Sequence, residues 1–181
     1  MAVQKTIAII GATGTMGSAI TLLLARTNNE LLLMARDQQK IKTLSDFLKK
    51  EYPLTDTHAV HCSKEACWEA DIIIMAIPGE VEAEVANDIK EVVTQKIVIS
   101  VSPETSLSHL QQVIPHSKIV KAFYSNTPSE LKVAKPGQRI NSFIMSDDEE
   151  ALNAISEMLS SVGLNPIIYD VKSPSISNFN F

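Results

Sequence analysis

No stretch of this sequence is apolar for long enough to cross a membrane, because no window reaches the roughly 18 consecutive apolar residues that a spanning helix needs. The first residues also lack the basic and then apolar order of a secretory signal. Positive charge is not in excess either, since the net charge is −5, and a nucleic-acid surface is not expected. We therefore expect a cytoplasmic protein that binds neither membrane nor nucleic acid.

Cysteine and metal-ligand motifs are also scarce. The two cysteines, Cys62 and Cys67, form neither a CxxC pair nor a disulfide framework, and we predict two free, packed thiols. The four histidines show no metal-ligand spacing such as HExxH, so no metal site is predicted. Trp68 is predicted to pack in a helix rather than to stack on bases.

The 181 residues, 45% of them hydrophobic, have the composition of an ordinary globular domain. Strand and helix patterns alternate with short connections, which predicts an α/β fold: a Rossmann-type, doubly wound, mostly parallel sheet with helices on both faces. Strands are expected near 6–10, 30–35, 58–61, 71–77, 96–101, 118–124, 142–146 and 166–170, and helices near 15–27, 38–50, 64–68, 80–94, 106–113 and 148–162. We expect one domain of this type over 1–171 and a tail over 172–181.

Three glycines at three-residue spacing follow the first strand pattern, and helical periodicity begins after them. Gly11 would allow a sharp turn, Gly14 a close approach of a pyrophosphate to the backbone, and Gly17 close packing of the helix. The spacing is one residue longer than the common G-x-G-x-x-G, and a purely structural turn is the alternative. The predicted nucleotide-binding residues of this turn are Gly11, Thr13, Gly14, Thr15, Met16 and Gly17.

The residues after the second strand bear on the choice of cofactor. An acidic residue at this position takes the adenosine ribose of NAD, whereas Arg36 offers a guanidinium for the 2′-phosphate of NADP, with Lys40 in reach. Asp37 complicates this prediction because it could accept the ribose hydroxyls of NAD. The alternative is that Arg36 and Lys40 belong to a solvated face. A preference for NADP(H) is predicted.

Ligands of an open parallel sheet lie beyond the carboxyl ends of its strands. This places Ala76, Ile77, Pro78 and Ser102 on the nicotinamide side. Hydride transfer needs mainly alignment and exclusion of water, but a C=N or C=O acceptor also needs a proton. Lys121, Tyr124 and Thr127 are the candidates for that role, and each has an ordinary structural alternative.

Five segments together resemble one family, the NADP oxidoreductases that use the deazaflavin coenzyme F-420. They are GATGTMG at 11–17, the pair Arg36 and Lys40, IMAIP at 74–78, KIVISV at 96–101 and IVKAF at 119–123. VKAFYSNTP at 120–128 also resembles the cofactor domain of pyrroline-5-carboxylate reductase. Those reductases continue into a helical domain, which this chain does not show, so the deazaflavin-dependent family is the closer match. The resemblance implies NADP(H) as cofactor and a deazaflavin as a possible second substrate.

The sequence thus predicts an NADP(H)-dependent oxidoreductase that transfers hydride between the nicotinamide and a deazaflavin-like or small organic acceptor. The alternatives are a non-catalytic NADP(H)-binding sensor and a pyrroline-5-carboxylate-reductase-like cofactor domain that lacks its helical domain. A homodimer is also predicted, because the nicotinamide edge needs a cover. We expect 126–132 and the tail, with Ile176, Phe179 and Phe181, to approach the partner.

Overall fold

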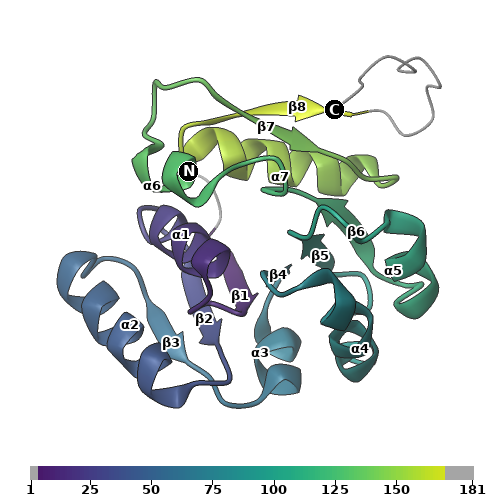
Figure 1. Cartoon of the computed structure of the whole chain (residues 1–181), viewed down its shortest axis with the longest axis horizontal. Coiled ribbons are helices and arrows are strands. Elements are labelled where there is room, and N and C mark those ends of the chain that lie inside the picture. Colours follow the sequence, from purple (N-terminus) through teal and green to yellow (C-terminus); the bar gives the residue numbers. More distant parts are fainter. Residues whose placement is uncertain (1–3, 170–181) are drawn as a thin grey trace.

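A computed structural model describes residues 4–169 (Figure 1). The strands are β1 (Thr6–Ile10), β2 (Glu30–Met34), β3 (Thr57–Ala59), β4 (Ile72–Met75), β5 (Ile97–Ser100), β6 (Lys118–Lys121), β7 (Ile140–Ile144) and β8 (Leu164–Ile168). The helices are α1 (Thr15–Leu24), α2 (Gln38–Glu51), α3 (Ser63–Glu69), α4 (Gly79–Ile89), α5 (Leu107–Val113), α6 (Pro128–Val133) and α7 (Glu149–Ser161). The predicted tail, 172–181, lies outside the described residues.

The first six strands form one parallel sheet in the order β3-β2-β1-β4-β5-β6. The chain therefore moves outward from β1 in one direction and then returns to start again at β4. The carboxyl ends of β1 and β4 flank this switch point, where open α/β sheets bind their ligands. The predicted Rossmann-type α/β fold is confirmed.

Alternating side chains of the strands enter two separate cores. Ile7 and Ile9 face the core that α1, α2, α6 and α7 cover, whereas Ala8 and Ile10 face the core of α3, α4 and α5. Since both faces of the sheet are buried, the strands are apolar throughout rather than alternately polar. This explains why short apolar runs located the strands so well.

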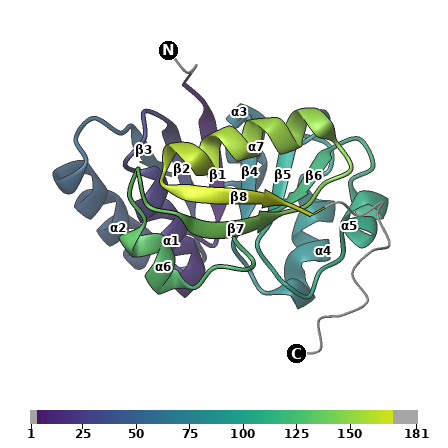
Figure 2. The ribbon, with the colours of Figure 1, turned by 90° about the horizontal axis from the view of Figure 1, so that it is seen from above.

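The last two predicted strands do not extend the large sheet. β7 and β8 pair with each other in parallel and lie with α7 on one side of that sheet (Figures 1 and 2). A single antiparallel bridge between Lys121 and Met145 joins them to β6. β7 is exposed at alternate residues, including Phe143, so it is a strand with one covered face.

Three local expectations were wrong. Trp68 is 68% exposed rather than packed, and Cys62 is exposed, so of the two thiols only Cys67 is buried. α6 was not predicted, although its sequence carries the signals of a helix start. Thr127 and Glu130 form a reciprocal capping box around Pro128 at the first helical position.

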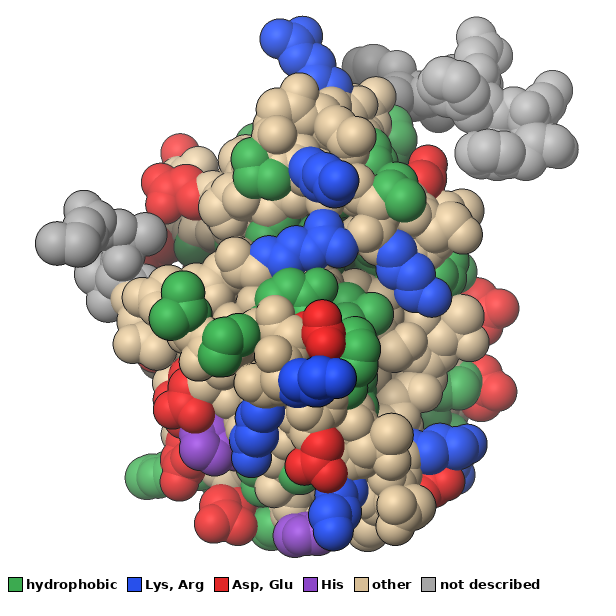
Figure 3. All heavy atoms as spheres, turned by 90° about the vertical axis from the view of Figure 1, so that its left-hand side faces the viewer, with side chains coloured by type: hydrophobic (Ala, Val, Ile, Leu, Met, Phe, Trp, Pro, Cys, Tyr) green, Lys and Arg blue, Asp and Glu red, His purple; other side chains and the backbone are tan. Residues whose placement is uncertain are grey.

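The side of the molecule formed by α2, α1 and α6 faces the viewer in Figure 3. Lys and Arg side chains are spread from the top to the bottom of this face, and acidic side chains lie between the lower ones. Opposite charges are therefore interspersed here rather than separated. Among residues 4–169, no helix combines the length and the hydropathy that a membrane crossing requires.

Candidate functional site

The three glycines differ in what surrounds them. Gly11 has a φ of +85°, and a Cβ there would lie 2.3 Å from the carbonyl oxygen of Ala76. A Cβ on Gly17 would lie 2.0 Å from the carbonyl oxygen of Gly11. A Cβ on Gly14 would meet only that same oxygen, at 3.3 Å, and otherwise open space. Gly11 and Gly17 are therefore needed for the turn itself, whereas Gly14 leaves space in front of it.

α1 begins without a cap. Gly14 occupies the N-cap position and has no side chain to accept from the backbone, and the first turn holds no acidic residue. Within the described part of the chain, no acceptor is found for the amides of Thr15, Met16 and Gly17. These free N–H groups and the helix dipole form an electropositive end beside the half-buried Thr13. Such an end is suited to a phosphate group.

The β2–α2 loop lies next to this turn, because the amides of Gly11 and Ala12 both donate to the carbonyl of Met34 at 2.9 Å. Asp37 caps α2: one carboxylate oxygen accepts from the amides of Gln39 and Lys40, each at 3.1 Å. The hydrogen bond from the Lys40 amide is the main cause that lowers the pKa of Asp37; burial opposes it, and the Lys40 charge adds to the lowering.

The cations of this loop remain near the surface. The Lys40 ammonium, 70% exposed, lies 3.7 Å from the second oxygen of Asp37. The exposed Arg36 guanidinium has no hydrogen-bond or ion-pair partner among the described residues. Asp37 is thus occupied as a helix cap, while Arg36 is free to bind an anion.

Two further loops complete this edge of the sheet. Ala76 and Ile77 lie over Gly11, and Pro78 occupies the N-cap position of α4. A Cβ on Gly79 would lie 2.6 Å from the hydroxyl oxygen of the buried Ser102, so the β4–α4 and β5–α5 loops are in contact there. All twelve predicted cofactor residues lie in the loops, or in the first turns that follow them, at the carboxyl ends of the central strands.

The three candidate proton donors are all engaged. Lys121 is only 6% exposed, and its ammonium donates to the carbonyls of Pro103 at 3.0 Å and Thr105 at 2.6 Å. The same ammonium lies 5.1 Å from the ring centre of Tyr124. Burial lowers the pKa of Lys121 and raises that of Tyr124. The Thr127 hydroxyl is used in the α6 capping box.

Glu82 is the residue that sequence reasoning missed. The apolar spacing of Val81, Val85 and Ile89 predicts that these residues face inward from α4. Val81 is instead 37% exposed, and the buried side chains are Glu82, Ala86 and Ile89. The buried face is thus shifted by one position over the first half of the helix. Glu82 is fully buried, and its carboxylate accepts from the Ser100 hydroxyl at 3.1 Å. Burial raises the pKa of Glu82, although two hydroxyls and the Lys121 charge oppose the rise.

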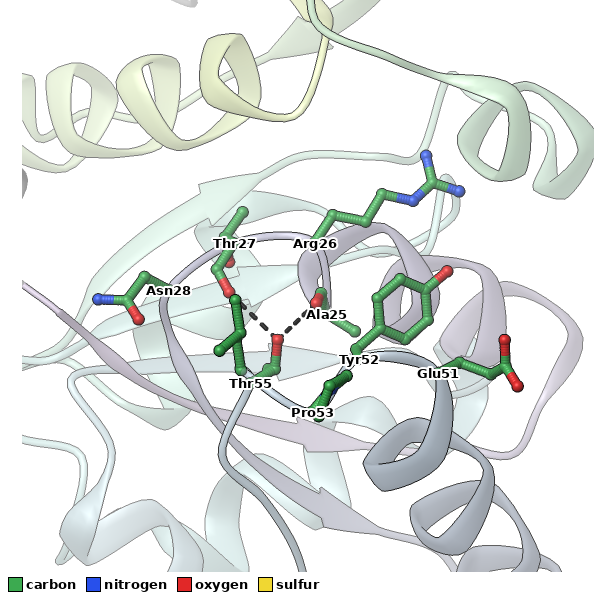
Figure 4. A pocket seen from close by; sticks show the side chains of 9 residues that line it. Ala25, Arg26, Thr27, Asn28, Glu51, Tyr52, Pro53 and Thr55 are labelled. Atoms are coloured by element: carbon green, nitrogen blue, oxygen red, sulfur yellow. Dashed lines mark hydrogen bonds between the residues drawn. The ribbon is translucent and has the colours of Figure 1, made fainter.

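The opposite, amino-terminal edge of the sheet carries a hollow of about 370 Å³ between the α1–β2 and α2–β3 loops (Figure 4). The Thr55 hydroxyl lies in it and is hydrogen-bonded to the backbone carbonyls of Ala25 and Thr27. None of its lining residues belongs to the glycine turn or to the loops that surround it. This hollow is therefore separate from the candidate nucleotide site.

The same edge holds an acidic group with one histidine. Glu30, Asp56 and His58 bring potential ligand atoms within 4.8 Å of one another. His58 lies 2.9 Å from Asp56, and Thr6 donates to Glu30 at 2.9 Å, so these atoms already have protein partners. Asp56 and His58 are exposed and Glu30 is partly exposed, which is typical of a surface ion-pair cluster.

Comparison with known proteins identifies the family to which this chain belongs. Residues 6–104, more than half of the chain, match the family described as NADP oxidoreductase coenzyme F420-dependent. The chain belongs to this family. An F420-dependent NADP reductase from Methanocaldococcus jannaschii is 25% identical to it, over 86% of this chain and 79% of the relative. The resemblance predicted from the sequence is confirmed, and the chain is a member of a family of NADP-dependent oxidoreductases.

Solved structures support the fold of this family member. A putative F420-dependent NADP reductase from Arthrobacter has a TM-score of 0.68 at 19% identity, over 92% of this chain and 85% of its own. A pyrroline-5-carboxylate reductase from Coxiella burnetii has a TM-score of 0.71 at 21% identity, over 95% of this chain but only 60% of its own. At these identities the similarity concerns the fold.

Proposed function

We propose that this member of the family binds NADP(H) across the carboxyl edge of the large sheet and transfers hydride between its nicotinamide and a second substrate. The observation that carries the proposal is the turn from Gly11 to Gly17, which ends in an uncapped helix start beside the free guanidinium of Arg36. Free amides and a free guanidinium are two anion sites on adjoining loops. NADP(H) has two phosphate groups to fill them, the pyrophosphate and the 2′-phosphate.

The proposed adenosine end rests on Arg36 and Lys40. A guanidinium binds a phosphate in a bidentate manner, and Lys40 adds a second cation from the first turn of α2. Asp37 would repel a 2′-phosphate if its carboxylate were free, but its oxygens accept from the α2 backbone and face Lys40. This arrangement favours NADP(H) over NAD(H).

The proposed nicotinamide end lies beside Ala76, Ile77, Pro78 and Ser102, where the β4–α4 and β5–α5 loops meet. The cofactor itself supplies the hydride chemistry, and the protein has to align the two reactants and exclude water. The names of the relatives indicate two classes of acceptor, a deazaflavin and a small organic molecule with a C=N bond. The proposed second substrate is a deazaflavin or another small molecule of this kind.

A sensor that binds NADP(H) without turnover is the second candidate function. It is favoured by one observation: Lys121 and Thr127 use their polar atoms within the protein, and Tyr124 is half-buried against Lys121. A hydride transfer to a deazaflavin does not depend on these groups in the same way as the reduction of an imine does. Turnover with any acceptor therefore separates the two candidates.

Two finer properties belong to the same proposal, a cytoplasmic location and a homodimer. Apolar side chains on three elements support the dimer: Val133 on α6, Phe143 on β7 and Ile168 on β8 are all exposed. Burying them against a second copy would remove apolar surface from water. Light scattering coupled to size exclusion tests the dimer, and a strictly monomeric protein at micromolar concentration would contradict it.

The proposed activity is tested by following NADPH oxidation with a deazaflavin, a flavin and pyrroline-5-carboxylate as separate acceptors. We expect turnover with at least one of them, and a lower rate when NADH replaces NADPH. Binding of NADPH without turnover on any acceptor would favour the sensor. Absence of NADPH binding would overturn both candidates.

A further inference from the structure

Two buried charged side chains are hydrogen-bonded to the β5–α5 loop, residues 101–105, or to the residue just before it. Lys121, at the carboxyl end of β6, donates to the carbonyls of Pro103 and Thr105. Glu82, in the first turn of α4, accepts from Ser100 immediately before the loop. Both side chains are more than nine-tenths buried. We propose that Lys121, with Glu82 as its counter-charge, is a positioning residue that fixes this loop for the nicotinamide end of the cofactor; this rests on the proposed function.

The loop transmits its position to the start of α4. Gly79 has no room for a side chain, because a Cβ would lie 2.6 Å from the Ser102 hydroxyl and 3.1 Å from the Thr105 hydroxyl. The two loops are therefore in direct contact through the side chains of Ser102 and Thr105. A shift of the loop would move Pro78 and Ser102 together, and both lie on the proposed nicotinamide side.

Glu82 leaves part of its hydrogen-bonding capacity unused. Its second carboxylate oxygen and the Thr105 hydroxyl oxygen are both buried, and neither has a hydrogen-bond partner in the described residues. A buried carboxylate so incompletely paired is costly unless a positive charge compensates it. Lys121 supplies that charge from the neighbouring strand. The pair therefore stabilises one arrangement of the loop at the expense of general stability.

The backbone pairing of Lys121 does not depend on its side chain. Its amide and carbonyl both pair with Met145, at 2.8 and 3.1 Å, in the bridge that joins β6 to the segment after β7. Replacing the side chain should leave this strand in place. The two carbonyls of the loop would then lose their shared donor, so the loop is the part that responds.

The structure contains a matched control at the other edge of the sheet. Lys96, just before β5, donates to the carbonyls of Cys67 and Trp68 and lies 5.9 Å from the Trp68 ring centre. Burial lowers the pKa of this lysine as well. Lys96 thus makes the same kinds of contact as Lys121, but far from the glycine turn. Its loss should affect stability and not the cofactor.

The test compares Lys121→Met with Lys96→Met in two titrations. The ligands are NADPH and adenosine 2′,5′-bisphosphate, which keeps the 2′-phosphate but has no nicotinamide. We expect Lys121→Met to weaken NADPH binding about tenfold, the scale of one charged hydrogen bond, and to change the bisphosphate affinity less than twofold. Lys96→Met should leave both affinities within twofold.

Glu82→Gln is the second variant and keeps the test independent of whether Lys121→Met folds, which its melting curve shows first. Glutamine keeps the shape and the bond from Ser100 but removes the counter-charge, so NADPH binding should weaken by a smaller factor and the bisphosphate affinity should stay constant. Equal losses for both ligands, or no loss for NADPH in either variant, would overturn the inference. A parent protein that binds neither ligand would instead overturn the proposed function.

Discussion

At each of the two edges of the large sheet, one lysine donates to two backbone carbonyls, but the two lysines stabilise different kinds of segment. At the amino edge, Lys96 donates to the last carbonyls of α3, which is where a cation stabilises a helix end. At the carboxyl edge, Lys121 donates to the carbonyls of a loop and faces a buried acid. The first arrangement completes a helix, whereas the second orders a segment that has no regular structure of its own.

The helix starts themselves differ in where backbone groups stay free. Side chains cap the starts of four helices: Asp37 for α2, Ser106 for α5, Thr127 for α6 and Asp148 for α7. α3 and α4 also begin without a side-chain cap, but each has an acidic residue in its first turn. α1 begins at a glycine and has neither a side-chain cap nor an acidic residue there. Because an absent cap leaves amides for a ligand, the helix that looks least stabilised is the one best suited to bind.

The largest expected effect separates two glycines of the same turn. Gly14→Val places a side chain in open space in front of α1, so it should abolish measurable NADPH binding while the melting temperature changes little. Gly17→Ala drives a Cβ into the Gly11 carbonyl, so it should destabilise the fold by about 1–3 kcal/mol or more. Thermal melts and NADPH titrations of both variants check this, and unaffected binding in Gly14→Val would show that the ligand lies elsewhere.

The next effect concerns the adenosine end. Arg36→Ala should weaken NADPH binding about ten- to hundredfold and leave NADH binding nearly unchanged, because only NADPH has a phosphate for the guanidinium. Lys42→Ala, which removes another exposed cation of α2, is the control and should change neither affinity. If the parent protein binds the two cofactors equally well, Arg36 does not select between them.

A smaller effect follows from the buried acid. Burial raises the pKa of Glu82, so the folded protein keeps a proton on this carboxyl to a higher pH than the unfolded chain does. The stability that this group contributes is complete below its ordinary pKa of 4.5 and is lost as the pH rises through the raised value. Glu82→Gln removes this loss. Its melting temperature relative to the parent should therefore rise as the pH increases above 4.5. A relative melting temperature that falls with pH would mean that the Lys121 attraction outweighs burial.

The smallest effect concerns the cysteines. Burial raises the pKa of the Cys67 thiol to about 12, whereas Cys62 is exposed. Since the thiolate is the reactive form, a maleimide at pH 7.5 should label one thiol per folded chain and two after unfolding. Mass spectrometry of the labelled peptides identifies the site. Fast labelling of Cys67 in the folded protein would contradict the burial of this thiol.

Local signals in the sequence were sufficient to predict which residues lie along most of the carboxyl edge of the sheet. Glycine spacing, a basic residue after the second strand and apolar runs each depend on a few neighbouring residues, so Gly11, Arg36 and Pro78 were placed correctly at the carboxyl ends of strands. Glu82 was missed because a charged residue in an amphipathic helix is normally solvated. Only the tertiary structure brings Ser100 and Lys121 to it.

The pairing of strands that are distant in the sequence was the second feature that could not be predicted. The sequence showed that 142–146 and 166–170 favour strands, but strand propensity does not say which strands are partners. β7 and β8 accordingly formed their own sheet. Trp68 was misplaced for a related reason, since a large apolar residue on a short helix can cover a lysine stem rather than enter a core.

Amide hydrogen exchange with and without NADPH tests the central claim, that the cofactor occupies the carboxyl edge. We predict protection of the backbone amides at 11–17, 35–40, 76–79 and 101–105, where the uncapped helix start and the lysine-held loop lie. The amino edge, including 25–28 and 51–55 around the hollow, should exchange at the same rate in both states. Protection confined to the amino edge, or none at 11–17 under saturating NADPH, would contradict the account.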